Sequence, residues 1–315
     1  MHTLFTQFWQ LTFSGTAQGF IYILISLGYT MVYGVLRMIN FANSEIFMFG
    51  TFATIITARN ILGHQPNGPT IHGFTLIYSL LLCLIASMLT SGIVALLVEF
   101  VAYRRLRSRG SNRLAPLISA IGMSIVLSET ARLLTASRAV PAPELLAKKS
   151  LATVLGANLR VDQVMVILVA PIIYFFLQRF VNRTRLGKAI RAVSMSEETA
   201  KLMGVNLNRV ISATFLIGGL MTGAAAFFFE TVYEATKFNI GFNLGIAAFT
   251  AAVLGGIGNI KGAFWGGLFL GLLETYASAV LGAQWKAITV FVVLVLVLLF
   301  RPSGLFGEAV QQTRV

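Results

Sequence analysis

The feature that most constrains this chain is a succession of apolar segments, most of them long enough to cross a bilayer as a helix. A membrane-spanning helix needs about 20 predominantly apolar residues. The segments cover residues 15–35, 41–58, 74–101, 114–134, 161–180, 210–232, 240–256, 263–281 and 287–300. The second and the seventh are short and interrupted. The sequence therefore predicts an all-α, polytopic transmembrane helical bundle with about eight or nine spans.

Composition agrees with lipid as the solvent of this chain. Hydrophobic residues make up 57% of the sequence and charged residues only 11%, whereas soluble domains carry about 25% charged residues. The net charge is +13, which in a membrane protein indicates cationic loops and contact with anionic lipid. The basic loops lack interleaved aromatic residues, so we expect no nucleic-acid partner.

Side chains that could support catalysis or metal binding are scattered. The only cysteine, Cys83, lies inside an apolar segment, and the histidines His2, His64 and His72 show no metal-ligand spacing. We expect no metal site, no bound cofactor and no catalytic residues in this chain.

Two basic loops predict the orientation in the membrane. One covers residues 104–113 and the other residues 179–209. Cytoplasmic loops are enriched in Lys and Arg, so both loops should face the cytoplasm. Counting spans outward from them places the N-terminus outside and the C-terminus inside. Residues 135–160 become an external loop, although they include four basic residues.

Glycines recur four residues apart in several spans. Because lipid offers little hydrophobic force between helices, small residues that allow close backbone approach supply the packing. We expect such contacts at the pairs Gly15 and Gly19, Gly219 and Gly223, Gly262 and Gly266, and Gly267 and Gly271.

Two polar stretches, residues 34–45 and 254–262, interrupt apolar regions. Unsatisfied backbone is not tolerated in lipid, so such breaks survive only where they are buried in protein or line a watery cavity. An ordinary surface loop is the alternative for both, and we favour it for the second. Within the first break, the candidates for lining a transport path are Asn40, Phe41, Asn43, Ser44 and Glu45.

Ionisable side chains near membrane depth are few, and such groups usually face a bundle interior or a partner. Glu129 and Arg132 are three residues apart and should pair on one helix. Glu230 and Glu234 are expected on a solvated helix end. Glu274 lies deepest by counting, and either a place on the path or a structural hydrogen bond would explain it.

The cytoplasmic segment at about residues 182–209 has a helical pattern of its own. Leu186, Ile190 and Val193 fall on one helical face. Ser194 stands three residues before Glu197, which is typical of a capping box at a helix start. A helix of about two turns should follow and end at Gly204 as its C-cap. The pattern fits either a surface feature or a knob that binds a cytoplasmic partner.

Four motifs, in order along nearly the whole chain, resemble those of branched-chain amino acid ABC transporter permeases. In chain order, the first is Tyr33-Gly34-Val35 with Ile39-Asn40-Phe41-Ala42 and Glu45, and the second is Gly187-Lys188-Ala189-Ile190-Arg191-Ala192 through Leu202-Met203-Gly204-Val205. The third is the run from Ala247 to Asn259, and the fourth is Arg301-Pro302-Ser303-Gly304-Leu305-Phe306-Gly307. The family commonly has His-Gly before the glutamate where this chain has Asn43-Ser44, and a small or apolar residue at Arg37.

The resemblance implies that the whole chain is one transmembrane permease domain of a bacterial cytoplasmic-membrane importer. Its partners would be two ABC ATPase subunits, a second permease chain (related rather than identical in most such systems) and an external solute-binding protein. ATP and Mg would be bound by the ATPases, because Gly187-Lys188 is followed by alanine and forms no Walker A motif. Contacts with an ATPase would come from Ser194, Glu197, Glu198, Ala200, Leu202, Met203 and Gly204.

Branched-chain or related hydrophobic amino acids are the solutes that the resemblance implies, and urea or short amides are an alternative. A self-contained secondary carrier or channel is a second hypothesis, but the sparse intramembrane charges supply no obvious coupling set. A membrane-embedded enzyme would require a cluster of reactive side chains, which the scattered histidines do not provide.

Overall fold

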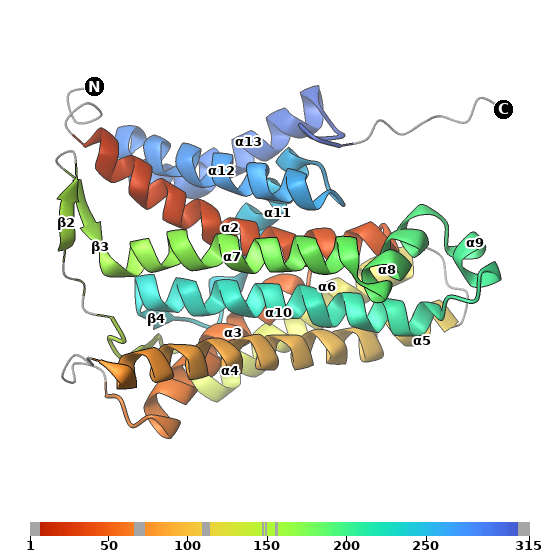
Figure 1. Ribbon diagram of the computed structural model, residues 1–315, viewed down its shortest axis with the longest axis horizontal. Helices are drawn as coiled ribbons and strands as arrows, with labels where there is room; N and C mark the ends of the chain where they lie inside the picture. The colour runs from red at the N-terminus through yellow and green to blue at the C-terminus, as the bar shows by residue number, and fades with distance from the viewer. Residues whose placement is uncertain are drawn as a thin grey trace.

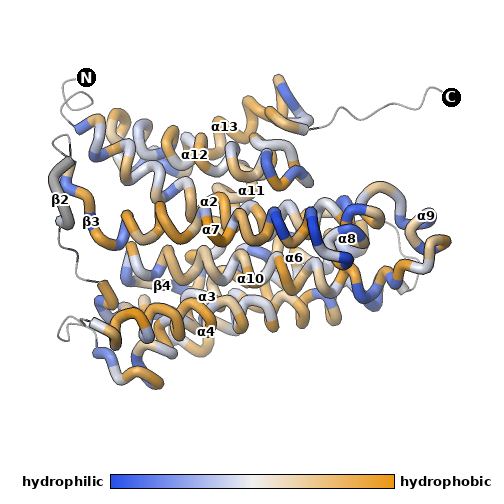
Figure 2. The backbone as a smooth tube through the Cα atoms, viewed as in Figure 1, coloured by the Kyte–Doolittle hydropathy of each residue, from blue (hydrophilic) through white to orange (hydrophobic). Residues whose placement is uncertain are grey.

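Long apolar helices lie side by side along one axis of the protein, with polar segments gathered at the two ends of the bundle (Figures 1 and 2). This computed structural model describes residues 7–65, 73–108, 114–146, 148, 150–154 and 157–307. The prediction of an all-α membrane bundle is confirmed.

Seven helices in the described part of the chain are long and apolar enough to cross a membrane. They are α2 (Phe8–Leu36), α4 (Phe74–Val98) with its continuations η2 (Glu99–Arg104) and α5 (Arg105–Ser108), α6 (Leu114–Thr135), α7 (Val161–Arg183), α10 (Leu207–Tyr233), α12 (Ile260–Leu281) and α13 (Lys286–Phe300), which follows the short turn η3 (Ala283–Trp285). The second and seventh apolar segments form shorter helices, α3 (Asn43–Ile56) with a π-helical extension η1 (Thr57–Ile61), and α11 (Ile240–Gly255). The predicted count of eight or nine spans therefore agrees approximately with the long and shorter apolar helices of the described residues.

Glycines allow the close approach of helices at the centre of the bundle. A Cβ atom on Gly267 would lie 2.8 Å from the backbone nitrogen of Ile23, and one on Gly271 would overlap the backbone of Gly19, so α12 and α2 touch backbone to backbone. On the other side of the bundle, a Cβ on Gly223 would lie 2.7 Å from the Cα of Met88, where α10 crosses α4. The remaining predicted packing glycines lie at the same kind of contact: Gly15 against α12, Gly219 against α4, and Gly262 and Gly266 against α11.

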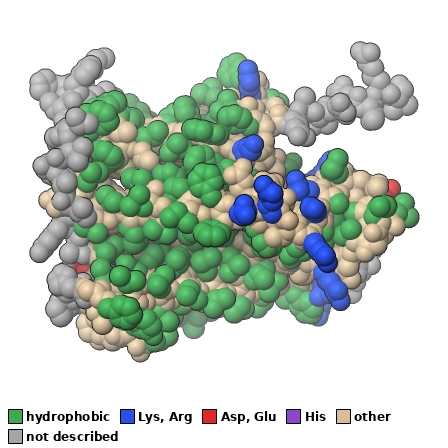
Figure 3. Space-filling view, in the orientation of Figure 1, with side chains coloured by type: hydrophobic (Ala, Val, Ile, Leu, Met, Phe, Trp, Pro, Cys, Tyr) green, Lys and Arg blue, Asp and Glu red, His purple; other side chains and the backbone are tan. Residues whose placement is uncertain are grey.

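The two basic loops lie at the same end of the bundle. Arg107 Nη2 donates a hydrogen bond to Asn208 Oδ1 over 2.6 Å, which joins the end of α5 to the start of α10. Lys and Arg side chains gather over this end in the space-filling view (Figure 3). The short helices α8 (Arg185–Met195) and α9 (Glu197–Leu202) project here as well.

Short strands form at the opposite end. The hairpin of β2 (Ser150–Val154) and β3 (Ala157–Arg160) lies beside the start of α2, where Asn158 N donates to Gln10 Oε1 over 2.8 Å. β1 (Val140–Pro141) pairs with β4 (Ala235–Thr236) in an antiparallel ladder. The loop predicted at residues 135–160 thus contains three short strands.

The second predicted break is a tight turn between α11 and α12, as the loop interpretation expected. Gly256 and Gly258 adopt φ values of 102° and 95°, a region that side chains rarely tolerate. Asn259 caps α12, since its Oδ1 accepts from the backbone nitrogens of Lys261 and Gly262 at 3.0 and 3.3 Å.

The C-terminal motif completes this turn. The backbone nitrogens of Leu305 and Phe306 donate to the carbonyls of Leu254 and Gly255 at 2.8 and 3.0 Å. A helix leaves its last four carbonyls without internal partners, so residues 301–307 satisfy the end of α11. Asn259 Nδ2 donates to Phe306 O over 2.9 Å and joins the two motifs from the other side.

Candidate functional site

The first break separates α2 from α3 and enters the bundle. α2 ends at Leu36, and Arg37 takes a left-handed conformation with φ 51°. Arg37 Nη2 then donates to the carbonyl of Ser194 over 3.1 Å, which ties the end of α2 to α8. Arg37 therefore has a structural contact with the segment after α7, at the position where the resembling family commonly has a small or apolar residue.

Two buried asparagines of the break carry donors without partners. Asn40 Oδ1 accepts from Ala42 N at 3.2 Å and from Tyr103 OH at 3.3 Å. Asn43 Oδ1 accepts from Thr222 Oγ1 at 3.2 Å. The Nδ2 groups of both asparagines have no hydrogen-bond partner in the part of the chain that the structure describes. A buried donor left unpaired costs about 1–3 kcal/mol, so each is a place where water or a polar solute would be stabilised.

Glu45 lies in the first turn of α3, where a carboxylate interacts favourably with the helix dipole. Its Oε1 accepts from Ser44 Oγ and from Ser124 Oγ of α6, both at 3.4 Å, whereas Oε2 has no partner among the described residues. Phe41, next to this group, is partly exposed, and the other four predicted path residues are buried. Asn40, Asn43, Ser44 and Glu45 thus form one buried polar cluster.

Glu274 lies in a different polar cluster on α12. Its Oε2 accepts from Tyr22 OH over 2.5 Å, and its Oε1 is 3.6 Å from Lys286 Nζ. Both partners lie outside the first break. Of the two interpretations of Glu274, a place on the path or a structural hydrogen bond, the structure therefore supports the hydrogen bond.

Two other acidic residues depart from the sequence-based expectation. Glu230 is buried and has no partner on either carboxylate oxygen in the described residues, and Glu234 is bound to Lys148 Nζ at 2.6 Å. The prediction of a solvated helix end is wrong for Glu230, because α10 packs against the first half of α2 here: Tyr233 OH, on the same turn of α10, donates to Gln18 Oε1 of α2 over 2.6 Å. Glu99, which the sequence analysis missed, is buried at the basic end, where it accepts from Ser212 Oγ at 3.0 Å and lies 3.6 Å from Arg107. Glu99 and Arg107 are eight residues apart, beyond the three- or four-residue spacing of helical ion pairs, so spacing did not indicate this pairing.

The short helices between α7 and α10 follow the predicted pattern in their packing. Ile190 and Val193 of α8 are buried, and Leu186 packs against the core beside them. α8 begins at the N-cap Thr184, whose Oγ1 accepts from Gly187 N over 3.0 Å. This face fixes α8 against the bundle, so α9 is held by a rigid neighbour.

The predicted cap of the second short helix, α9, is wrong by two residues. Ser196, in an extended conformation, is the N-cap of α9, and its Oγ accepts from Thr199 N at 3.2 Å. Ser194 remains inside α8, where its Oγ donates to the carbonyl of Arg191 over 2.7 Å. The buried face of α8 extends the helix to Met195, which moves the break past Ser194.

α9 ends as predicted at Gly204. This glycine has φ 81°, its backbone nitrogen donates to Lys201 O at 2.9 Å, and Val205 N donates to Ala200 O at 3.0 Å. These two bonds form a Schellman motif. Ala200 faces inward, whereas Leu202 and Met203 are 87% and 80% exposed. Glu197 and Glu198 open the helix, so α9 presents an apolar tip after an acidic start.

Replacing Ser196 by alanine is expected to destabilise α9 by about 1 kcal/mol, the usual cost of losing an N-cap side chain. Hydrogen exchange at the Thr199 amide should become faster. Ser194→Ala is the matched control and should leave that amide unchanged, since Ser194 bonds within α8. Equal exchange rates in the two variants would contradict the assignment of the cap.

A cavity of about 550 Å³ lies beside α9 at the basic end of the bundle. Its lining includes Arg104, Arg105 and Arg107 from the continuation of α4, Glu197 and Lys201 from α9, and Asn206 before α10. No group of three or more His, Cys, Asp or Glu side chains in the described ranges could hold a metal ion. Within the described residues, the arrangement fits the movement of a solute through a bundle.

Two known permease proteins are similar to this chain over almost its whole length. The permease protein BraD of the high-affinity branched-chain amino acid transport system of Pseudomonas aeruginosa is 39% identical over 94% of each chain. LivH of Escherichia coli strain K12, a permease protein with the same description, is 38% identical over 98% of each chain. The fructose import permease protein FrcC of Rhizobium meliloti is 28% identical over 51% of this chain and 48% of its own. The family model described as branched-chain amino acid transport system, permease component, matches residues 11–299, and the chain belongs to this family of membrane transport permeases.

Proposed function

We propose that this chain is a permease subunit of an ATP-driven ABC importer in the bacterial cytoplasmic membrane. Its solutes would be branched-chain or related hydrophobic amino acids, delivered by an external binding protein. The observation that carries the proposal is the near full-length similarity to BraD and LivH, both described as permease proteins of branched-chain amino acid transport. The buried polar cluster at the first break supports it, because lipid tolerates such a break only beside protein or a watery path.

The chain would work with a second permease, of a related sequence, and with two ATPase subunits that bind ATP and Mg. α9 is the element suited to meet an ATPase, because its apolar tip at Leu202 and Met203 is exposed at the basic end of the bundle. An apolar helix tip gains stability when a groove covers it. Movement of the ATPases would then pass through α8, whose buried face anchors α9 to the spans.

The basic end would face the cytoplasm. Arg and Lys side chains of the loops after α4 and α7 gather there (Figure 3), which is the distribution of cytoplasmic loops. The hairpin of β2 and β3 would then face the outside, and so would the start of α2.

Gentle affinity purification of this chain from native membranes, followed by mass spectrometry, tests the proposed assembly. Two ATPase chains and a second permease should accompany it. Recovery of this chain alone, under conditions that retain other ABC complexes from the same membranes, would favour a self-contained carrier or channel.

A further inference from the structure

The helix α6 carries a charged pair that the rest of the chain leaves uncovered. Arg132 Nε donates to Glu129 Oε1 over 2.7 Å, and Arg132 Nη2 binds the same oxygen. The side chains of Arg132 and Glu129 are 42% and 49% exposed. α6 is also one of the least buried of the candidate spans, so most of its surface must meet lipid, water or another chain.

Lipid is a poor environment for this pair. Glu129 lies six residues before the end of α6, which places it about 9 Å along the helix from that end. The apolar residues Leu133 and Leu134 follow the pair and are strongly exposed. Ionisable groups within a span are costly in lipid, and they almost always face a bundle interior or a water-filled cavity.

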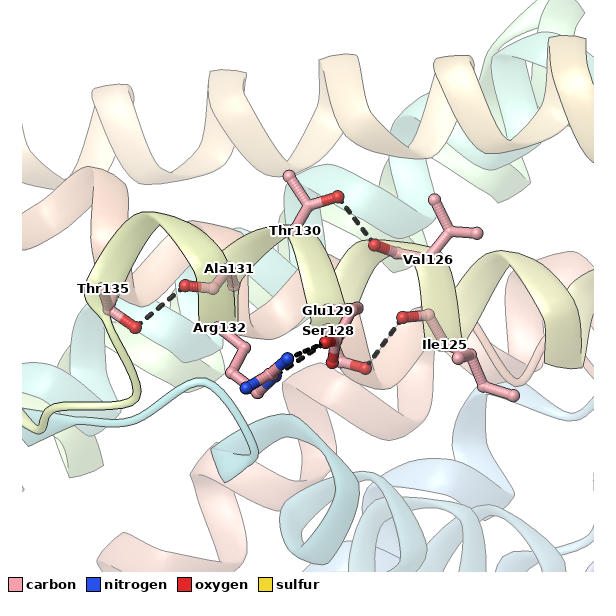
Figure 4. Close-up of polar contacts among 8 residues, drawn as sticks. All are labelled: Ile125, Val126, Ser128, Glu129, Thr130, Ala131, Arg132 and Thr135. Carbon is pink, nitrogen blue, oxygen red and sulfur yellow. Dashed lines mark hydrogen bonds and ion pairs between the residues drawn. The ribbon is translucent and has the colours of Figure 1, made fainter.

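The two exposed sides of α6 differ in chemistry. Ile125, Ser128, Glu129 and Arg132 follow the spacing of one helical face. In Figure 4, Glu129 and Arg132 point to one side of α6, and Val126 and Thr130 point to the opposite side. The hydroxyl of Thr130 donates to the carbonyl of Val126 over 2.7 Å, so it needs no further partner. Only the side with the charged pair requires a polar environment.

This polar side continues toward the first break. Ser124, one helical turn before Ser128, places its Oγ 3.4 Å from Glu45 Oε1. The other oxygen of Glu45 has no partner in the residues that the structure describes. Arg132, Glu129, Ser124 and Glu45 therefore place polar groups along α6 from one of its ends to the buried polar cluster of the first break.

We propose that this side of α6 lines the aqueous translocation path, and that Glu129 and Arg132 bind the two charged ends of a zwitterionic aliphatic solute. The inference rests on the proposed function and names a solute-binding element within it. Arg132 would donate to the solute carboxylate and Glu129 would accept from its ammonium group, so one ion pair is exchanged for two. Ile125, exposed on α6 about one turn before Glu129, would contact the aliphatic side chain.

Cysteine labelling tests the aqueous path directly. Cys83 is buried and is the only cysteine, so Cys83→Ala provides a background without thiols. In that background, Ile125→Cys and Val126→Cys form a matched pair at the same depth, on residues that are 62% and 58% exposed. In membrane vesicles from the native host, a charged methanethiosulfonate reagent should modify Ile125→Cys at least about tenfold faster, because lipid excludes the reagent and suppresses the thiolate.

Equal modification of the two positions would overturn the inference. The readout is chemical accessibility, so it tests the aqueous path even if the chain imports nothing with ATP. A failure of this inference can therefore be distinguished from a failure of the proposed function. In energised vesicles supplied with purified binding protein, saturating external leucine should slow the modification of Ile125→Cys. Arg132→Gln should abolish this protection, measured in each variant as the ratio of the modification rates with and without leucine. Protection that persists in Arg132→Gln would show that the pair does not bind the solute.

Discussion

Replacing Leu202 by aspartate is expected to abolish solute uptake while the chain remains folded in the membrane. Leu202 is the most exposed apolar side chain of α9, so its substitution disturbs no internal packing. Covering a leucine contributes about 1.5–3 kcal/mol, and a carboxylate in an apolar groove would reverse that gain. Uptake into vesicles should fall to background, and ATP hydrolysis should no longer respond to the loaded binding protein.

Two variants separate coupling from general damage. Leu202→Met keeps the apolar volume of the tip and should retain most of the uptake. Leu305→Asp places the same charge on another exposed leucine at the same end of the bundle, and should leave uptake near the unsubstituted level. Normal uptake by Leu202→Asp would contradict the role of α9 in coupling.

Replacing Gly271 by leucine is expected to prevent assembly of the bundle. A single Cβ on Gly271 already overlaps the backbone of Gly19, and backbone cannot move aside as a side chain can. Overpacking of this kind costs up to about 3 kcal/mol, or more when backbones must separate. Detergent extraction followed by size-exclusion chromatography should show loss of the monodisperse species.

Gly122→Leu is the control for that experiment. Gly122 lies in α6, another membrane helix, and an added Cβ there meets nothing within 4 Å. Both substitutions remove a glycine from a helix and add the same apolar side chain, so only the local contact differs. Comparable losses in the two variants would show that the α2–α12 contact is not what limits assembly.

Lipid explains why so much of this fold could be predicted. Every span must bring its own apolar run and satisfy its own backbone, so the helices appear in the sequence almost one by one. α2 nevertheless begins at Phe8, seven residues before the apolar run that predicted it. The hydroxyls of Thr12 and Thr16 donate to backbone carbonyls one turn earlier, so these polar side chains are satisfied within the helix. The contact of residues 301–307 with the turn after α11 could not be predicted from the sequence, because it joins backbone groups about 50 residues apart.

The site could be predicted less well, because its details depend on tertiary contacts. The spacing of Ser194 and Glu197 fits a capping box, but burial of Ile190 and Val193 carries α8 past Ser194, so that Ser196 becomes the cap. Glu230 and Glu234 lie four residues apart near a helix end, which indicated a solvated face, but tertiary contacts bury Glu230. The pairing of Glu129 with Arg132 was predictable, because it depends only on their spacing along α6.

The most direct test of the central claim is uptake of labelled leucine into liposomes that contain this chain with its purified partners. We expect accumulation only when ATP is present on the side of the basic end and a leucine-loaded binding protein is present on the other side. Accumulation that proceeds without ATP or without the binding protein, driven by an ion gradient or by the leucine gradient alone, would contradict the account.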